Sequence, residues 1–164
     1  MRIAGLFAGI GGFELGMHRA GHDTAMVCDV LPTARAVLEA RFPSADYRDD
    51  ITKLRSLPSD VDLVCAGFPC QDLSQAGLTA GLDGERSGLI GEVFRLLSRR
   101  RIPTVVVENV PFMLQLNGGS AMHAIVDEFE RRGYRWAYRV VDSWSFGLAQ
   151  RRERVILVAS REVD

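Results

Sequence analysis

A cysteine stands in a proline-stiffened loop directly after a strongly apolar segment. Residues 63–66 are Leu-Val-Cys-Ala, and residues 67–71, Gly-Phe-Pro-Cys-Gln, follow them. A thiol at an exposed strand end is placed as a nucleophile, provided that a nearby cation or backbone dipole enriches its thiolate form. Free cysteines more often serve as small buried hydrophobes. That second interpretation stays open for Cys70 and is the better one for Cys28 and Cys65.

A glycine-rich segment, residues 7–12 (Phe-Ala-Gly-Ile-Gly-Gly), lies between a predicted strand and a predicted helix, and Asp29 follows the next predicted strand. Glycines let the backbone turn tightly and let a ligand approach the main chain. An acid at Asp29 can accept hydrogen bonds from ribose hydroxyls, so the two features predict a nucleoside-containing ligand. Asp50-Ile51, after a short strand, can similarly hold an adenine amino group and ring face. These features do not separate dinucleotides from S-adenosylmethionine.

Two further polar groups lie at predicted strand ends nearer the C-terminus. Glu108-Asn109 ends an apolar strand, where a carboxylate suits a general acid or a hydrogen-bond partner for a ring nitrogen. Capping of the next turn is the alternative role. Residues 150–154, Gln-Arg-Arg-Glu-Arg, immediately precede the last predicted strand. Such a cluster is usually a solvated face, but at a crevice mouth it can hold a phosphate or orient Glu108.

Composition excludes several classes of protein. The chain has 164 residues, 47% hydrophobic and 25% charged, which is typical of a globular domain. A net charge of −1 gives no sign of nucleic-acid binding, and three cysteines fit a reducing compartment, the cytoplasm. Neither a bilayer-crossing segment nor a signal peptide is expected. The cysteines and the histidines fall in no metal-ligand spacing, so no metal site is predicted.

The elements that must position these residues follow from apolar periodicity. Strands are expected at residues 3–7, 25–28, around 47, 63–66, 104–107, 136–141 and 155–159. Helices are expected at residues 13–19, 32–42, 89–99 and from an N-cap at Ser120 to Gly133.

This alternation predicts an α/β fold with an open, mostly parallel sheet covered by helices on both faces. The last two strands are joined by too few residues for a crossover helix and are therefore expected to pair antiparallel. Residues 1–164 are expected to form a single domain. Ligands of such sheets bind beyond the carboxyl ends of the strands, and each of the motifs lies at such an end.

Taken in order, residues 7–12, 67–71, 108–110 (Glu-Asn-Val) and 150–154 closely resemble the motifs of the DNA cytosine-5 methyltransferases. The order and approximate intervals agree over nearly the whole chain. Phe68 and Ser74 look more like the DNA enzymes than their tRNA-modifying relatives. The resemblance implies a Rossmann-like sheet of the S-adenosylmethionine-dependent methyltransferase type, with methyl transfer to cytosine in DNA.

The resemblance also implies roles for individual residues. Cys70 would attack C6 of cytosine, Glu108 would hydrogen-bond the ring, Asn109 would support the cysteine loop, and Arg152 and Arg154 would brace the site. The S-adenosylmethionine pocket would be lined by Phe7, Gly9, Ile10, Gly11, Gly12, Asp29, Asp50, Ile51, Gly67, Pro69 and Leu89. The loop that closes over the substrate would include Gln71, Ser74 and Gln75.

The chain also departs from the family pattern. Gly5 stands where the family usually has Asp or Ser, and Val30 replaces an aromatic residue, so weaker cofactor binding is expected. Residues 1–164 contain none of the family's later motifs, and no target-recognition domain is expected. We therefore expect the catalytic subunit of a split enzyme, in which a second chain, or a second copy of this chain, supplies the rest. The alternatives are a stand-alone enzyme on DNA or a smaller cytosine-containing substrate, and an inactive or regulatory remnant that binds cofactor or a partner. The dinucleotide-binding fingerprint of an NAD-dependent oxidoreductase is absent from this sequence. The recognition sequence and the biological role, whether restriction protection, phage defence or another, are not encoded in these motifs.

Overall fold

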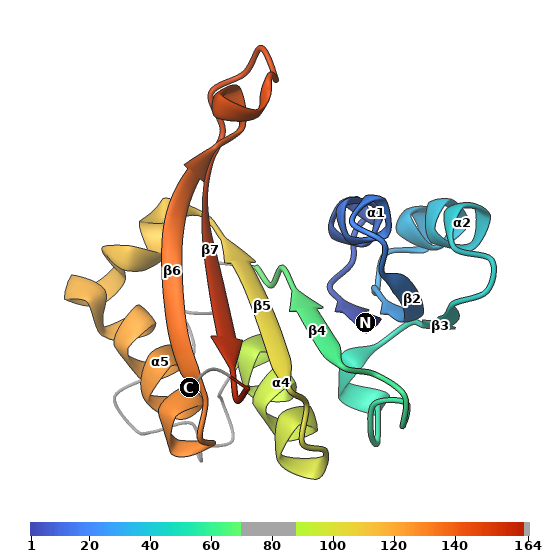
Figure 1. Cartoon of the computed structure of the whole chain (residues 1–164), viewed down its shortest axis with the longest axis horizontal. Helices are drawn as coiled ribbons and strands as arrows, with labels where there is room; N and C mark the ends of the chain where they lie inside the picture. The colour runs from blue at the N-terminus through green and yellow to red at the C-terminus, as the bar shows by residue number, and fades with distance from the viewer. Residues whose placement is uncertain (70–87, 163–164) are drawn as a thin grey trace.

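The computed structural model describes residues 1–69 and 88–162, which form one twisted sheet flanked by helices (Figure 1). Its strands are β1 (Arg2–Leu6), β2 (Asp23–Cys28), β3 (Asp46–Arg48), β4 (Leu63–Ala66), β5 (Thr104–Asn109), β6 (Arg135–Asp142) and β7 (Glu153–Ser160). The helices are α1 (Gly12–Arg19), α2 (Pro32–Arg41), α4 (Gly88–Arg99) and α5 (Ser120–Arg131). Short 3₁₀ turns are η1 (Ile51–Lys53), η3 (Pro111–Leu114), η4 (Leu116–Gly119) and η5 (Ser143–Phe146).

The strands lie in the order β3-β2-β1-β4-β5-β7-β6. Neighbours from β3 to β5 pair in parallel, whereas β7 is antiparallel to both β5 and β6. The predicted open, mostly parallel sheet with a reversed C-terminal strand is therefore confirmed. Because β6 is antiparallel to the one reversed strand, it runs in the same direction as β1–β5. The loops that follow all six of these strands consequently lie at one edge of the sheet, which is called the carboxyl edge below.

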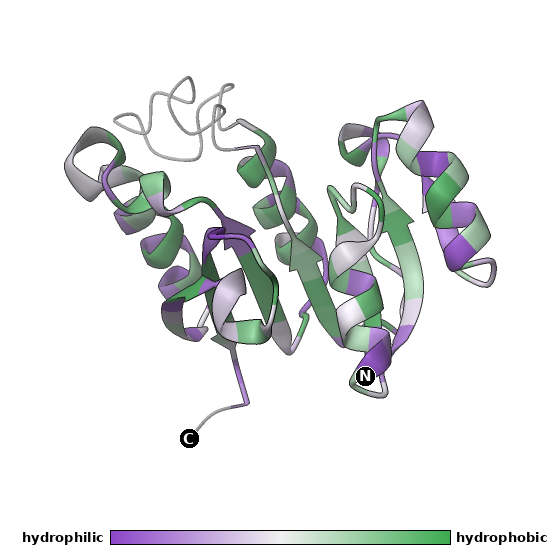
Figure 2. Cartoon of the chain, turned by 90° about the horizontal axis from the view of Figure 1, so that it is seen from above, coloured by the Kyte–Doolittle hydropathy of each residue, from purple (hydrophilic) through white to green (hydrophobic). Residues whose placement is uncertain are grey.

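Helices cover both faces of the sheet, as the alternating pattern predicts. On one face, Phe13 and Met17 of α1 pack on Ile3, Leu63 and Val106 of the central strands. Further along that face, α2 buries its own apolar side chains against β2. On the other face, α4 and α5 pack on the alternate residues of the same strands to form the largest core. Figure 2 shows the largely apolar strands between these helices.

Four element boundaries differ from expectation in ways that affect the site. Phe7 is not the last residue of β1 but begins the following turn, with a left-handed φ of 57°. Glu108 and Asn109 belong to β5, and Arg154 belongs to β7, so strand hydrogen bonds fix their backbones. The predicted N-cap of α5 is wrong: Gly119, with φ 90°, is the N-cap and Ser120 is the first helical residue. A left-handed entry into the helix favours glycine over serine.

Within residues 1–69 and 88–162, no helix has the length and apolarity needed to cross a membrane. The same ranges contain no group of three or more His, Cys, Asp and Glu side chains that is gathered closely enough to hold a metal ion.

Candidate active site

A cavity of about 340 Å³ opens at the carboxyl edge of the sheet. The ends of β1, β4 and β5 form its floor, and the glycine-rich turn with the start of α1 forms one wall. It is lined by Leu6, Phe7, Ala8, Gly9, Ile10, Gly12, Phe13, Glu14, Cys65, Gly67, Glu108 and Arg152. Seven of the predicted site residues are therefore brought together: Phe7, Gly9, Ile10, Gly12, Gly67, Glu108 and Arg152.

The glycine-rich turn owes its shape to Asp29, which is 9% exposed. One carboxylate oxygen of Asp29 accepts a hydrogen bond from the Gly9 amide at 2.7 Å, and the other accepts from the Leu31 amide at 2.9 Å. The Tyr47 hydroxyl donates to the Asp29 carbonyl at 2.7 Å. Asp29 lies outside the cavity lining but ties together the loops after β1 and β2. A carboxylate has about four lone-pair sites, so it keeps acceptor capacity for a ligand hydroxyl.

Glycine is needed at the positions of this turn for different structural reasons. A side chain at Gly9 or Gly12 would meet no atom within 4 Å, so their backbones are open to a ligand. Gly11 is different, because a Cβ there would lie 2.5 Å from the Phe42 ring, and its φ is 80°. Gly11 is therefore required for packing against the end of α2 and for the left-handed N-cap of α1, not for contact with the cavity.

Glu108 is held in the cavity by an ion pair across two strands. The Arg154 Nε lies 2.7 Å from Glu108 Oε1, with the side chains 20% and 27% exposed. The partners come from β5 and β7, where Glu108 is opposite Ile156, so Arg154 is its diagonal neighbour on the same face. Glu108 Oε2 faces Gly67, where a Cβ would lie 3.3 Å from it. One carboxylate oxygen is thus anchored, and the other faces the end of β4.

Asn109 connects β5 to the segment that leads to the cysteine. Its side-chain amide donates to the Phe68 carbonyl at 3.0 Å, and its side-chain oxygen accepts from the Val110 amide at 2.8 Å. Asn109 is 3% exposed, so these bonds form away from water. Phe68 is buried and Pro69 is exposed. Cys70 follows directly in the chain. The predicted residues Cys70, Gln71, Ser74 and Gln75 lie outside the described residues.

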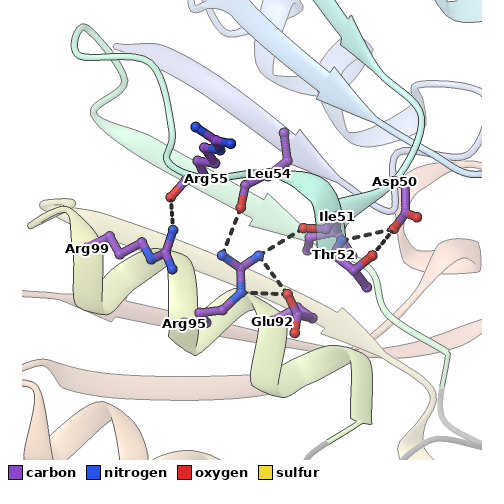
Figure 3. Close-up of polar contacts among 8 residues, drawn as sticks. All are labelled: Asp50, Ile51, Thr52, Leu54, Arg55, Glu92, Arg95 and Arg99. Atoms are coloured by element: carbon purple, nitrogen blue, oxygen red, sulfur yellow. Dashed lines mark hydrogen bonds and ion pairs between the residues drawn. The ribbon is translucent and has the colours of Figure 1, made fainter.

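The remaining predicted cofactor residues do not line this cavity. Asp50 caps η1, with its Oδ1 accepting from the Thr52 amide at 2.9 Å and the Thr52 hydroxyl at 2.7 Å (Figure 3). These two hydrogen bonds hold the pKa of Asp50 below its usual value. Ile51 is buried in the main core, and Leu89, near the start of α4, packs partly buried against the same core.

Glu14 is a site residue that sequence reasoning missed. It is only 1% exposed, and its Oε2 has no hydrogen-bond partner among the described residues. The absence of a side chain at Gly5 makes room for it, because a Cβ there would lie 1.9 Å from Glu14 Oε1. Burial, assisted by the negative charge of Asp29, raises the pKa of Glu14 from 4.5 to about 7. A glutamate in the first turn of a helix gives no sign of this, since such residues usually lie in solvent.

We expect Glu14→Gln to stabilise the protein at pH 8 but not at pH 4.5. A carboxyl whose pKa is raised on folding favours the folded state only while it is protonated, so its contribution is complete below 4.5 and is lost as the pH rises through 7. A shift of this size corresponds to at most about 3 kcal/mol in the free energy of unfolding. Urea unfolding at pH 4.5 to 8 measures the difference, with the exposed Glu39→Gln on α2 as the control. A constant difference between Glu14→Gln and the wild type across this range would contradict the assignment.

The two cysteines within the described residues are buried and free. Burial is the largest cause that raises the pKa of both Cys28 and Cys65 to about 12. Nearby carboxylates add to this effect, chiefly Asp29 for Cys28 and Glu14 for Cys65. Neither thiol is a thiolate near neutral pH, so the sequence-based interpretation of both as small buried hydrophobes agrees with their surroundings.

A family model described as C-5 cytosine-specific DNA methylase matches residues 1–164. The chain belongs to this family. It is 53% identical to the type II methyltransferase M2.BsuMI of Bacillus subtilis, over 98% of this chain and 42% of that protein. It is 32% identical to the type II methyltransferase M.AquIA of Picosynechococcus, over 98% of this chain and 72% of that protein. This chain therefore spans less than half the length of M2.BsuMI and nearly three quarters of the length of M.AquIA.

The fold of this methylase chain is that of solved methyltransferases. The Dnmt2 methyltransferase of S. pombe superposes with a TM-score of 0.79 at 18% sequence identity, over 100% of this chain and 50% of that one. A methyltransferase encoded within an E. coli prophage gives a TM-score of 0.75 at 21% identity, over 98% of this chain and 46% of that one. The predicted methyltransferase type of the sheet is thereby confirmed. The cavity described above lies in the part of the fold that they share.

Proposed function

We propose that this chain is the catalytic part of a DNA methyltransferase that transfers a methyl group from S-adenosylmethionine to C5 of cytosine. The observation that carries the proposal is the cavity at the carboxyl edge, where an anchored carboxylate, Glu108, and an open glycine turn face the same space. The strand that ends beside Glu108 continues through Gly67 into the segment bearing Cys70. Membership in the C-5 cytosine-specific family supports the same reaction.

The residues around the cavity fit S-adenosylmethionine. Gly9 and Gly12 leave main-chain atoms open beside Phe7, and Asp29, which binds the Gly9 amide, has acceptor capacity left for ribose hydroxyls. Asp50 Oδ2 lies 3.6 Å from the exposed Lys53 Nζ and keeps acceptor capacity for an adenine amino group, while Ile51 offers an apolar contact to the ring. When bound, this cofactor supplies a methyl group activated by its positive sulfonium. The residues of the chain hold and orient it beside the end of β1.

Cys70 is the nucleophile in this proposal. C5 of cytosine is too weak a nucleophile for direct methylation, so addition of the thiolate to C6 and protonation at N3 make C5 electron-rich. Methyl transfer to C5 is followed by loss of the C5 proton and departure of the thiolate, which restores the aromatic ring. The target base must leave the duplex to reach the cysteine. The high pKa of both Cys28 and Cys65 supports Cys70 as the reactive thiol of the three.

Glu108 and the arginines act on the same base. With Oε1 held by Arg154, Glu108 keeps Oε2 for the edge of the cytosine, where a carboxyl group can bond N3 and the exocyclic amine. Arg152 is exposed and lines the cavity, so its guanidinium is available for the displaced nucleotide or its phosphate. Asn109 acts indirectly, because its bond to the Phe68 carbonyl fixes the start of the cysteine segment.

Exposed apolar residues along the carboxyl edge, called the apolar rim below, support a protein partner. The apolar rim consists of large apolar residues in the loops at the carboxyl edge: Ile10, Val30, Leu31, Phe112, Trp144, Phe146 and Leu148. Each is more than half exposed, and Phe146 is 78% exposed. The hairpin that carries the last three projects beyond the ends of the other strands (Figure 1). Exposed apolar patches of this kind mark interaction sites. We propose that a second chain carrying target recognition covers this rim, with a second copy of this chain as the alternative.

A methyl-transfer assay tests the proposal. The purified chain is incubated with duplex DNA and tritiated S-adenosylmethionine, with and without the protein from the adjacent reading frame. We expect weak cofactor binding and little transfer by the chain alone, and strong transfer with the second chain. Sequence-specific methylation at full rate by the chain alone would contradict the split enzyme. Tight NAD binding without S-adenosylmethionine binding would contradict the reaction itself. A homodimer in ultracentrifugation with full activity would identify a second copy as the partner.

We expect Phe146→Ser to weaken association with the second chain by at least about tenfold, since aromatic anchors at interfaces contribute about 1–4 kcal/mol. The matched control is Val158→Ser on β7, which removes a 42% exposed apolar residue away from the carboxyl edge. Titration calorimetry of the two chains measures the dissociation constants. An equal loss for both variants would show that the rim is not the docking surface.

A further inference from the structure

Helix α4 holds the turn that carries Asp50 and Ile51 through a single arginine (Figure 3). Arg95 Nη2 donates to the Ile51 carbonyl at 2.9 Å, and Arg95 Nη1 donates to the Leu54 carbonyl at 2.8 Å. The side chain is 27% exposed, and its Nε donates to Glu92 Oε2 at 2.6 Å. Glu92 lies one turn earlier on α4, so it neutralises the guanidinium and fixes its plane. The guanidinium is thus held by Glu92 on one side and hydrogen-bonds the turn on the other.

The turn itself has little to stabilise it. η1 contains only three residues, and its N-terminal end is capped by the side chain of Asp50. Carbonyls at the C-terminal end of so short a helix need partners from elsewhere. Arg95 supplies a partner for the Leu54 carbonyl at the C-cap. It also adds a second donor to the Ile51 carbonyl, which already accepts from the Leu54 amide at 3.2 Å. Because Ile51 is also buried against the apolar face of α4, the backbone around Asp50 is fixed relative to this helix.

We infer that Arg95 is a positioning residue for the adenine end of the cofactor site, acting through the turn at Asp50 and Ile51. The inference rests on the proposed function, because it takes adenine as the ligand of this turn. α4 also carries Leu89, the predicted cofactor contact at its N-terminal end, so one helix supports both. With Arg95 in place, Asp50 Oδ1 is occupied by Thr52, and Oδ2 lies 3.6 Å from the exposed Lys53 Nζ. A carboxylate oxygen has more than one lone pair, so Oδ2 keeps acceptor capacity for a ligand. Arg95 therefore sets selectivity for the adenine amino group.

The chain offers a matched control in Arg99. This residue lies one turn further along α4 and donates to the Arg55 carbonyl at 2.7 Å. It makes the same kind of bond to the same segment of chain, but beyond the turn. A purely structural contribution of Arg95 would therefore be shared by Arg99, whereas a contribution to ligand selectivity would not.

The test measures binding of S-adenosylhomocysteine and of S-inosylhomocysteine, which lacks the adenine amino group. Calorimetry is done on the full chain at ligand concentrations high enough to detect the weak cofactor binding expected of the chain alone. We expect the wild type to prefer the adenine compound. Arg95→Ala should weaken binding of the adenine compound by about tenfold and remove most of the preference. Arg95→Lys should restore part of both, because one of the two carbonyl bonds can form. Arg99→Ala should change neither by more than about twofold. Thermal unfolding of each variant measures stability separately.

Three results would overturn the inference in distinguishable ways. If Arg95→Ala binds both compounds as the wild type does, the inference is wrong and the proposed function stands. If the wild type binds neither compound, the proposed cofactor is wrong and the inference falls with it. A loss of affinity in Arg95→Ala that leaves the preference intact, with an equal loss in Arg99→Ala, would show a structural effect only.

Discussion

Cys70→Ser is expected to reduce methyl transfer by more than about 10³-fold, the scale on which removal of a catalytic nucleophile acts. A serine hydroxyl stays protonated near neutral pH and cannot add to C6 of cytosine at a useful rate. The same substitution should abolish the covalent complex with DNA containing 5-fluorocytosine, because that complex requires the sulfur–C6 bond. Methyl transfer is measured with tritiated cofactor, and the complex is measured by denaturing electrophoresis.

Cys65→Ala is the matched control for this experiment. Cys65 lines the same cavity, but its thiol is buried and its pKa is about 12, so it is not a nucleophile near neutral pH. The variant should still capture the fluorinated DNA. Covalent capture of the DNA by Cys70→Ser, or loss of capture in a folded Cys65→Ala variant, would show that Cys70 is not the nucleophile.

Glu108→Gln is expected to lower kcat by about 10²–10⁴-fold, the usual contribution of a positioned general acid or base. The amide keeps the shape of the side chain but can neither carry a proton to N3 nor form the ion pair with Arg154. The KM for S-adenosylmethionine should change little, since the role assigned to Glu108 is toward the base. Steady-state kinetics of the assembled enzyme measure both quantities.

Substitutions of Arg154, the ion-pair partner of Glu108, provide a second test of the role of Glu108. Arg154→Lys keeps a positive charge near Glu108 Oε1 and should retain part of the activity, whereas Arg154→Met should lose most of it. Arg151 is the control, because it stacks on Trp144 and does not line the cavity. Full activity of a folded Glu108→Gln variant would remove the carboxylate from the mechanism.

The comparison of sequence with structure is clearest at the strand ends. Short apolar runs located all seven strands of the described sheet, and the parallel sense of the first five placed the motifs after β1, β4 and β5 at one edge. Boundaries shifted by one or two residues where side chains at strand ends are polar. Glu108 and Arg154 belong to strands for this reason, since the ladder between β5 and β7 continues through them.

The sequence by itself determined the strands and their mostly parallel sense, the order of the motifs along the chain and the edge at which they meet, because these depend on local periodicity and chain direction. The order of the strands across the sheet came from the structure. Tertiary structure decided which side chains touch. The pair Glu108–Arg154 exists because β7 inserts beside β5 in one register, and Glu14 is buried because Gly5, on a neighbouring strand, leaves space for it. The hydrogen bond from Arg95 to the Ile51 carbonyl likewise joins residues 44 positions apart. Such contacts depend on how whole elements pack, which no short segment of sequence specifies.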